Sequence, residues 1–381
     1  MIYFDNNATT QIAPEVRAAM MPFLDAEFGN PSAGYGFGRA AAIAVEDARE
    51  SVAGLLGAAR SDEIVFTSGG TESDNWAILG AIEARPECRH VITTKVEHEA
   101  VRKLCEKLER SGCRVTWLEV DMDGALDMDA LRASLCAETA VVSVMLANNE
   151  TGILFPVDEI GQIVRENSEA LFHVDGVNAA GKIPVDLKAT EIDLFSVSGH
   201  KFHAPKGIGA LYIRDGVKLP AAATGGGQES GRRAGTEAVH QIVGIGAAAE
   251  FVKDISRMEY VGAMRDRLEK EILSKIPNSR LNGTADISKR LPNTSYISFE
   301  NTNGEAILAR LDALGICVST GSACNSQDHT ASPVLQAMNV PYSWAMGSIR
   351  FSLGRFNRTA EVDKVIEVLP GIVQSLRKLG N

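Results

Sequence analysis

ALFHVDGVNAAGKIPVDLKATEIDLFSVSGHK, at residues 170–201, contains two short apolar runs, each followed by polar residues. The runs 170–175 and 193–198 are rich in aromatic and β-branched residues, which favour strands. Both are nearly continuous in apolar residues, a pattern typical of parallel strands buried on both faces of a sheet. We therefore expect two such strands, with Asp175 at the end of the first and Lys201 just beyond the second.

The same pattern of apolar runs continues on both sides of this stretch. Five further runs are separated by segments with helical periodicity, for example 72–84 and 157–166. The sequence therefore predicts an α/β fold whose mainly parallel, seven-stranded sheet is covered by helices on both faces. The five runs are EIVFTS at 63–68, HVITTK at 90–95, RVTWLEV at 114–120, AVVSVML at 140–146 and GALYIR at 209–214.

The pattern changes after about Phe251, where a smaller α+β domain is indicated. A chain of 381 residues is long enough to form two hydrophobic cores. We expect a large domain at 16–257 and a small domain formed by 1–15 and 258–381. The elements predicted for the second part are a charged helix at 258–275, strands at 293–299 and 316–320, and a helix from Ala360.

The composition is that of an ordinary folded protein, with 45% hydrophobic and 23% charged residues and no biased tract. A net charge of −11 argues against a nucleic acid as the main partner, because phosphate backbones attract basic surfaces. We expect neither a signal peptide nor a membrane span. The six cysteines form no CxxC pair and no zinc spacing, so we expect no metal site, and reduced thiols in a cytoplasmic protein.

Asp175 and Lys201 follow strands that would be neighbours, so both should face the crevice at the carboxyl edge of the sheet. A salt bridge is the simplest interpretation. The pair also meets the needs of a pyridoxal phosphate (PLP) enzyme, in which an amine holds the aldehyde and a carboxylate keeps the pyridine nitrogen protonated. Ser198 and His200 are placed to donate hydrogen bonds to the phosphate. Lys206 is the rival amine, and we assign it to the turn before the next strand.

Three other strand ends carry residues suited to the same crevice. Gly70 and Thr71 open a helix directly after a strand, where free N–H groups can hold a phosphate, although such a turn is often only a turn. His98 is either an ordinary polar loop residue or an imidazole that stacks on a ring and moves protons near neutral pH. Asn149 offers an amide to ring substituents or substrate, or simply forms a turn.

The loop STGSACNS at 319–326 places Cys324 among small residues. Such neighbours leave a thiol exposed, whereas the other five cysteines lie in apolar helical or strand-like patterns and are expected in the core. An accessible thiol is what sulfur transfer requires. Arg350, in the run SIRFSLGR, is suited to bidentate binding of an amino-acid carboxylate.

Together these motifs resemble the NifS/IscS-type cysteine desulfurases, which belong to the fold-type I PLP-dependent transferases. The resemblance covers essentially the whole chain, in order. The matching segments are YFDNNATT (3–10), GNPS (29–32), EIVFTSGGTESDN (63–75), EHEAV (97–101), NNETG (148–152), HVDGVNAAGKIPVDL (173–187), SGHKFHAPKGIGALYIR (198–214), GGGQESGRRAGT (225–236), STGSAC (319–324) and SIRFSLGR (348–355).

The resemblance implies a role for each residue. Lys201 would form a Schiff base, His98 would stack on the ring and move protons, and Cys324 would accept the sulfur. Arg350 and Asn30 would hold the substrate carboxylate. The residues implied to contact the cofactor are Gly70, Thr71, Ser198 and His200 at the phosphate, Asp175 at the ring nitrogen, Asn149 and Asn178 at the ring substituents, and Thr236 from the other subunit of a homodimer. Position 178 is Asn where the family usually has Gln.

The activity implied by the resemblance is removal of sulfur from L-cysteine, giving L-alanine and a persulfide on Cys324. The sulfur would pass to an acceptor protein, such as an iron–sulfur scaffold or a thiolation carrier. Two alternatives share the scaffold: a selenocysteine lyase, and a cysteine lyase that eliminates sulfide. A third is a non-catalytic assembly subunit, against which the set of Lys201, Asp175, His98 and Cys324 argues.

Overall fold

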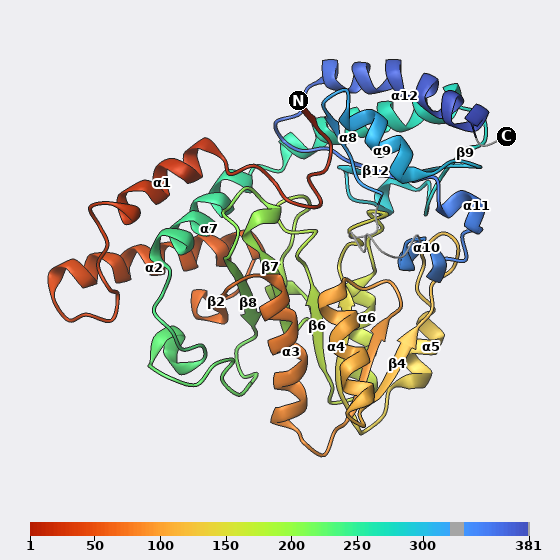
Figure 1. Ribbon diagram of the computed structural model, residues 1–381. Coiled ribbons are helices and arrows are strands. Elements are labelled where there is room, and N and C mark those ends of the chain that lie inside the picture. Colours follow the sequence, from red (N-terminus) through yellow and green to blue (C-terminus); the bar gives the residue numbers. More distant parts are fainter. Residues whose placement is uncertain (321–330, 380–381) are drawn as a thin grey trace.

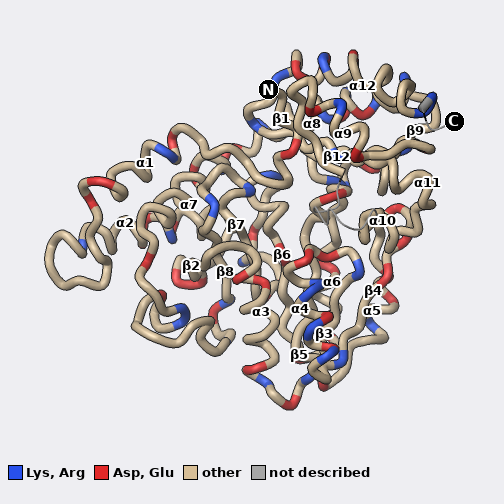
Figure 2. The backbone as a smooth tube through the Cα atoms, viewed as in Figure 1, with Lys and Arg blue, Asp and Glu red and all other residues tan. Residues whose placement is uncertain are grey.

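The computed structural model describes residues 1–320 and 331–379, so Cys324 lies outside the described residues. Figure 1 shows a larger body built around a central sheet, with a smaller body beside it. Figure 2 shows acidic and basic residues interspersed over both bodies. None of the described helices is long and apolar enough to cross a membrane.

The central sheet has seven strands in the order β2-β8-β7-β6-β5-β3-β4, which confirms the expected α/β fold. β8 runs antiparallel to β2 and β7, and the other neighbouring strands are parallel. The parallel strands therefore end at one edge of the sheet. The strands are β2 (Ile64–Thr67), β3 (His90–Thr94), β4 (Arg114–Leu118), β5 (Thr139–Met145), β6 (Leu171–Asp175), β7 (Leu194–Ser198) and β8 (Gly209–Ile213).

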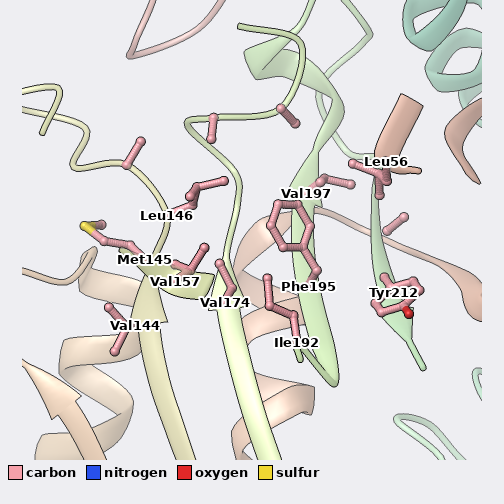
Figure 3. Packing of buried hydrophobic residues seen from close by; sticks show 14 of the residues in the cluster. Leu56, Val144, Met145, Leu146, Val157, Val174, Ile192, Phe195, Val197 and Tyr212 are labelled. Carbon is pink, nitrogen blue, oxygen red and sulfur yellow. The ribbon is translucent and has the colours of Figure 1, made fainter. Parts of the chain in front are cut away.

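Helices cover both faces of this sheet because successive side chains of each strand point to opposite sides. Val65 belongs to a cluster with Trp76 of α3, whereas Phe66 belongs to the main cluster with Leu56 of α2. Figure 3 shows part of the main cluster, including Phe195 and Tyr212. The helices of the larger body are α1 (Pro14–Leu24), α2 (Gly36–Leu56), α3 (Gly70–Ala84), α4 (Glu99–Arg110), α5 (Met128–Ser134), α6 (Val157–Asn167) and α7 (Val239–Val252).

The smaller body has a separate cluster of buried side chains, which runs from Phe4 to Val373 in sequence. Its sheet has the order β12-β10-β9, and β1 pairs with β11 in parallel. The boundaries 16–257 and 258–381 stay predictions. The remaining elements are β1 (Ile2–Tyr3), α8 (Ser256–Lys275), β9 (Ser279–Leu281), β10 (Thr294–Phe299), α9 (Gly304–Asp312), β11 (Ile316–Cys317), α10 (Pro333–Ala337), α11 (Tyr342–Ala345), β12 (Ser348–Ser352) and α12 (Thr359–Leu379).

The N-terminal segment connects the two bodies. Phe4 is buried in the smaller cluster, and Asp5 forms a bridge with Ser352 after β1 ends. Asn7 then donates to the Thr294 hydroxyl at 2.8 Å, and Thr10 donates to the His200 carbonyl at 2.9 Å. Residues 5–10 therefore run along the carboxyl edge of the central sheet.

Candidate active site

A cavity of about 450 Å³ opens at the carboxyl edge of the sheet. The residues that follow β2, β3, β5, β6 and β7 line it, because the carboxyl ends of parallel strands meet at one edge. The structure thus brings together nine of the predicted site residues, although their roles stay predictions. They are Gly70, Thr71, His98, Asn149, Asp175, Asn178, Ser198, His200 and Lys201.

Lys201 ends the 3-10 turn that follows β7. Its Nζ donates to the Asn7 carbonyl at 2.5 Å and to the Ala8 carbonyl at 3.1 Å. Burial and, to a smaller extent, the charge of Arg350 lower the pKa of Lys201 to about 8, against the opposing effect of Asp175. Roughly a tenth of this amine is therefore unprotonated at pH 7, and the unprotonated form is the one that a nucleophile or base requires. Lys206 also lines the cavity but is exposed in the turn before β8.

Asp175 ends β6 and is 4% exposed. One of its carboxylate oxygens, Oδ1, accepts a hydrogen bond from the Val177 N–H at 2.9 Å. Burial raises the pKa of Asp175, and nearby His98 and Lys201 oppose this effect. A buried carboxylate gains stability from a cation beside it. The Asp175 carboxylate is therefore suited to bind a protonated ring nitrogen in the cavity.

His98 is the N-cap of α4, and its Nδ1 accepts a hydrogen bond from the Ala100 N–H at 3.2 Å. The neutral ring therefore carries its proton on Nε2. The side chain is accessible to solvent through the cavity, but desolvation by the surrounding protein lowers its pKa, and Lys201 lowers it further against the effect of Asp175. A neutral imidazole that can accept a proton results.

The Gly69–Gly70 turn brings the start of α3 against the cavity. Gly69 has φ = 149°, a value that side chains disfavour, and a Cβ on Gly70 would lie 2.7 Å from Val177. The free N–H groups of the 15-residue helix α3 begin here, next to buried Ser198. This arrangement suits an anion such as a phosphate.

The two adjacent asparagines after β5 differ in function. Asn148 forms the turn, because its Oδ1 accepts from the N–H groups of Glu150 and Thr151 at 3.0 and 2.9 Å. Asn149 lines the cavity, and its carbonyl accepts from Arg350 Nη1 at 2.9 Å. Turn formation by Asn148 leaves the Asn149 amide for a ligand.

Three predicted site residues do not line this cavity. Arg350 is 4% exposed, and its Nη2 forms an ion pair with Asp5 at 2.7 Å. Thr236 is exposed and lines a neighbouring cavity of about 160 Å³. Asn30 is exposed between α1 and α2, where its Oδ1 accepts from the Ser32 N–H. Their assignments to substrate or cofactor stay predictions.

The sequence did not reveal four residues at or beside the site. Ala8 lines the cavity, and Asn7 and Lys182 support it from behind. Asp74 lines it from α3, is 1% exposed, and its Oδ1 has no hydrogen-bond partner among the described residues, with His173 Nε2 3.6 Å away. Burial raises the pKa of Asp74, and Asp175 raises it further. The sequence did contain a signal for Asp74. It lies four residues after Gly70, so the two residues share one side of the helix.

The expectation that the other five cysteines are core residues is wrong for two of them. Cys88, Cys105 and Cys113 are buried, whereas Cys136 and Cys317 are partly exposed. Cys136 follows α5 in a loop, and Cys317 lies between the buried Ile316 and Val318, so the alternation of an extended chain turns its side chain away from the core. In the described ranges, no group of three or more His, Cys, Asp or Glu residues could hold a metal ion.

Comparison with known proteins supplies the family. Residues 2–365 match the family model described as aminotransferase class-V. A cysteine desulfurase of Nostoc sp. is 54% identical over 381 residues, covering 100% of this chain and 94% of that protein. A solved structure described as a NifS-like protein has a TM-score of 0.92 at 37% identity, covering 98% of this chain and 100% of the other.

A second solved structure, described as SspA in complex with cysteine, has a TM-score of 0.83 at 33% identity. The match covers 94% of this chain and 100% of that one. These matches extend over nearly the full length of every chain compared, so they include the cavity and both bodies. The chain therefore belongs to the aminotransferase class-V family and, within it, to the NifS-type cysteine desulfurases.

Proposed function

We propose that this enzyme uses PLP to remove the sulfur from L-cysteine, releasing L-alanine and leaving a persulfide on Cys324. One observation carries the proposal: Lys201 and Asp175 line the same cavity, in a chain 54% identical to a cysteine desulfurase. Cysteine as the substrate is also supported by the related structure described as a complex with cysteine.

The residues of the cavity fit PLP. The start of α3 at Gly70 and Thr71, with Ser198 and His200, would hold the phosphate. Asp175 would pair with the ring nitrogen, and Asn149 and Asn178 would contact ring substituents. When bound, PLP supplies an electron sink for the charge that remains after the substrate Cα loses its proton.

Lys201 is the proposed base at the substrate Cα, because its lowered pKa leaves it partly unprotonated. His98 would take the proton of the substrate thiol. The Cys324 thiolate then attacks the substrate sulfur, so that one S–S bond forms and the substrate C–S bond breaks. The electron pair of that bond stays on carbon, which gains a proton and becomes the methyl group of alanine.

Arg350 is the proposed partner of the substrate carboxylate. Its guanidinium already contacts Asp5 and the Asn149 carbonyl, and its Nε is buried without a partner among the described residues. A substrate carboxylate would therefore compete with Asp5 for the guanidinium. Asn30 would contribute from the α1–α2 loop only if another subunit brings it to the cavity.

Two variants test the chemistry. Lys201→Ala should abolish the visible absorbance band of bound cofactor, and a persistent band would identify the wrong lysine. Cys324→Ser should retain cofactor but stop alanine release. Unchanged turnover in that variant would indicate a lyase that needs no protein thiol.

Product analysis separates the alternatives. Alanine, with a persulfide on Cys324, supports the desulfurase, whereas pyruvate and free sulfide would indicate β-elimination. Preference for selenocysteine over cysteine would indicate a selenocysteine lyase. A colourless purified protein without turnover would indicate a non-catalytic assembly subunit.

A homodimer is part of the proposal. Helices α1 and α2 project from the larger body in Figure 1, and they and their connecting loop expose several large apolar side chains, which mark an interaction surface. Thr236 is exposed as well, as a residue that reaches a partner's phosphate site would be. The apolar side chains are Met21, Leu24, Phe28, Tyr35, Phe37 and Ile43. A solution mass of twice 40.7 kDa is expected.

We further propose a cytoplasmic enzyme that passes its sulfur to an acceptor protein, such as an iron–sulfur scaffold or a thiolation carrier. Five cysteines in the described ranges are free, as in a reducing compartment. Capture of the persulfidated enzyme's partner, followed by detection of transferred sulfur, tests the acceptor.

A further inference from the structure

Lys182 is a buried lysine that the proposed reaction does not use. It is 6% exposed and lies in the hydrogen-bonded turn after β6, four residues beyond Asn178. In the described part of the chain, no carboxylate pairs with its Nζ. Burial lowers the pKa of Lys182 well below its ordinary value, and the charges of Lys201 and Arg350 lower it further. Burying an amine among neutral acceptors is unfavourable. The hydrogen bonds of Lys182 therefore indicate that the amine has a function at this position.

The Lys182 amine holds both oxygens of Asn178. Its Nζ donates to Asn178 Oδ1 at 2.8 Å and to the Asn178 carbonyl at 2.9 Å. The chain turns back between the two residues through Gly181, which has φ = 73°, and this turn brings the Lys182 amine to Asn178. Because the amide oxygen faces Lys182, the amide NH₂ group faces the other way. One of its hydrogens points to the Asn148 carbonyl at 3.4 Å, and Asn178 lines the large cavity.

The same amine also holds Asn7. Lys182 Nζ donates to Asn7 Oδ1 at 3.1 Å, and Asn7 Nδ2 donates to the Asn149 carbonyl at 3.1 Å. The Asn7 carbonyl accepts from Lys201. Lys182 and Lys201 also line a common cavity of about 20 Å³ behind the main one. Lys182 is thus linked directly to Asn178, and through Asn7 to Asn149 and Lys201.

We propose that Lys182 is a positioning residue that turns the Asn178 amide so that a hydrogen-bond donor, and not an acceptor, faces an oxygen of the bound cofactor. The inference rests on the proposed function, because it requires PLP in the cavity. A side chain as short as Asn has little reach, so its orientation decides whether the donor is available. Lys182 fixes that orientation from the side away from the ligand.

A double-mutant cycle on PLP affinity tests this role. PLP is titrated into the full-length wild-type chain, Lys182→Met, Asn178→Ala and the double variant, and the growth of the visible absorbance band gives each dissociation constant. Loss of one hydrogen bond to the cofactor weakens binding by about 10-fold. We expect about this loss in each single variant and no further loss in the double variant, because Lys182 acts through Asn178.

Additive losses, about 100-fold in the double variant, would overturn the inference, since a general structural role of Lys182 does not depend on Asn178. Unchanged affinity in Lys182→Met would overturn it as well. Thermal unfolding checks that each variant folds. If Lys182→Met does not fold, Lys182→Gln replaces it in the cycle, because Gln keeps a donor but is too short to reach both oxygens. If the wild-type chain binds no PLP, the proposed function itself fails.

Discussion

Replacing Glu97 by Gln should stabilise the protein relative to the wild type, and this stabilisation should be larger in alkaline than in acidic solution. Glu97 is 5% exposed, and its Oε1 accepts hydrogen bonds from the Thr94 hydroxyl at 2.8 Å and the Met145 N–H at 3.1 Å. Its Oε2 is buried without a partner in the described ranges. Burial and, to a smaller extent, the charge of Asp175 raise the pKa of Glu97 from 4.5 to about 8, against the effect of the two hydrogen bonds.

The sign and size of the effect follow from proton linkage. The folded state keeps the proton while the unfolded state loses it, so this residue's contribution to stability is complete below pH 4.5 and is lost as pH rises through 8. Each pKa unit corresponds to about 1.4 kcal/mol. The loss between pH 5 and pH 9 is therefore on the order of 4 kcal/mol. A glutamine does not ionise, so it avoids this loss.

Urea unfolding followed by tryptophan fluorescence at pH 5 and pH 9 measures the effect. The free energy of unfolding of Glu97→Gln minus that of the wild type should be about 4 kcal/mol larger at pH 9 than at pH 5. Glu99→Gln is the matched control, because Glu99 is exposed two residues away. Equal differences between variant and wild type at the two pH values would refute the reasoning.

Three further predictions concern the active site and the core. The rate of alanine formation should rise between pH 6.5 and about pH 8, because only the unprotonated Lys201 amine accepts a proton, and a flat profile would contradict this. A Cβ on Gly176 would lie 1.9 Å from the Phe195 ring, so Gly176→Ala should lose about 1–3 kcal/mol of stability, and adding Phe195→Leu should restore part of it in thermal unfolding. Glu229→Ala should lose about 3–5 kcal/mol of stability, because it removes the buried carboxylate 2.7 Å from Arg49 and leaves this buried guanidinium only the exposed Glu46 as an ion-pair partner. Adding Arg49→Met to Glu229→Ala should recover stability in the same assay.

Much of the site could be predicted because it obeys one geometric rule. Asp175 is the last residue of a strand, and Lys201, His98 and Asn149 follow strands. Parallel strands end at one edge, so local sequence was enough to place these residues together. The direction of β8 was not predictable, because the apolar run 209–214 is compatible with either orientation.

Residues that act through long-range contacts could not be found in this way. Asn7 reaches Lys182 across 175 residues of sequence, and nothing in its local pattern indicates that partner. Lys182 is a single lysine in a turn, and no local pattern in the sequence distinguishes it. Its burial depends on the N-terminal segment that crosses the sheet edge, a feature that no strand or helix pattern encodes.

The path of residues 1–10 has a consequence for synthesis on the ribosome. Ile2, Asn7 and Asp5 are translated long before their respective partners Ile316, Thr294 and Ser352. The nascent chain therefore cannot seat Asn7 and Ala8 at the cavity until most of the polypeptide has emerged. Cofactor capture should consequently be a late, post-translational event, and fusions that restrain the N-terminus should impair it more than fusions after α12.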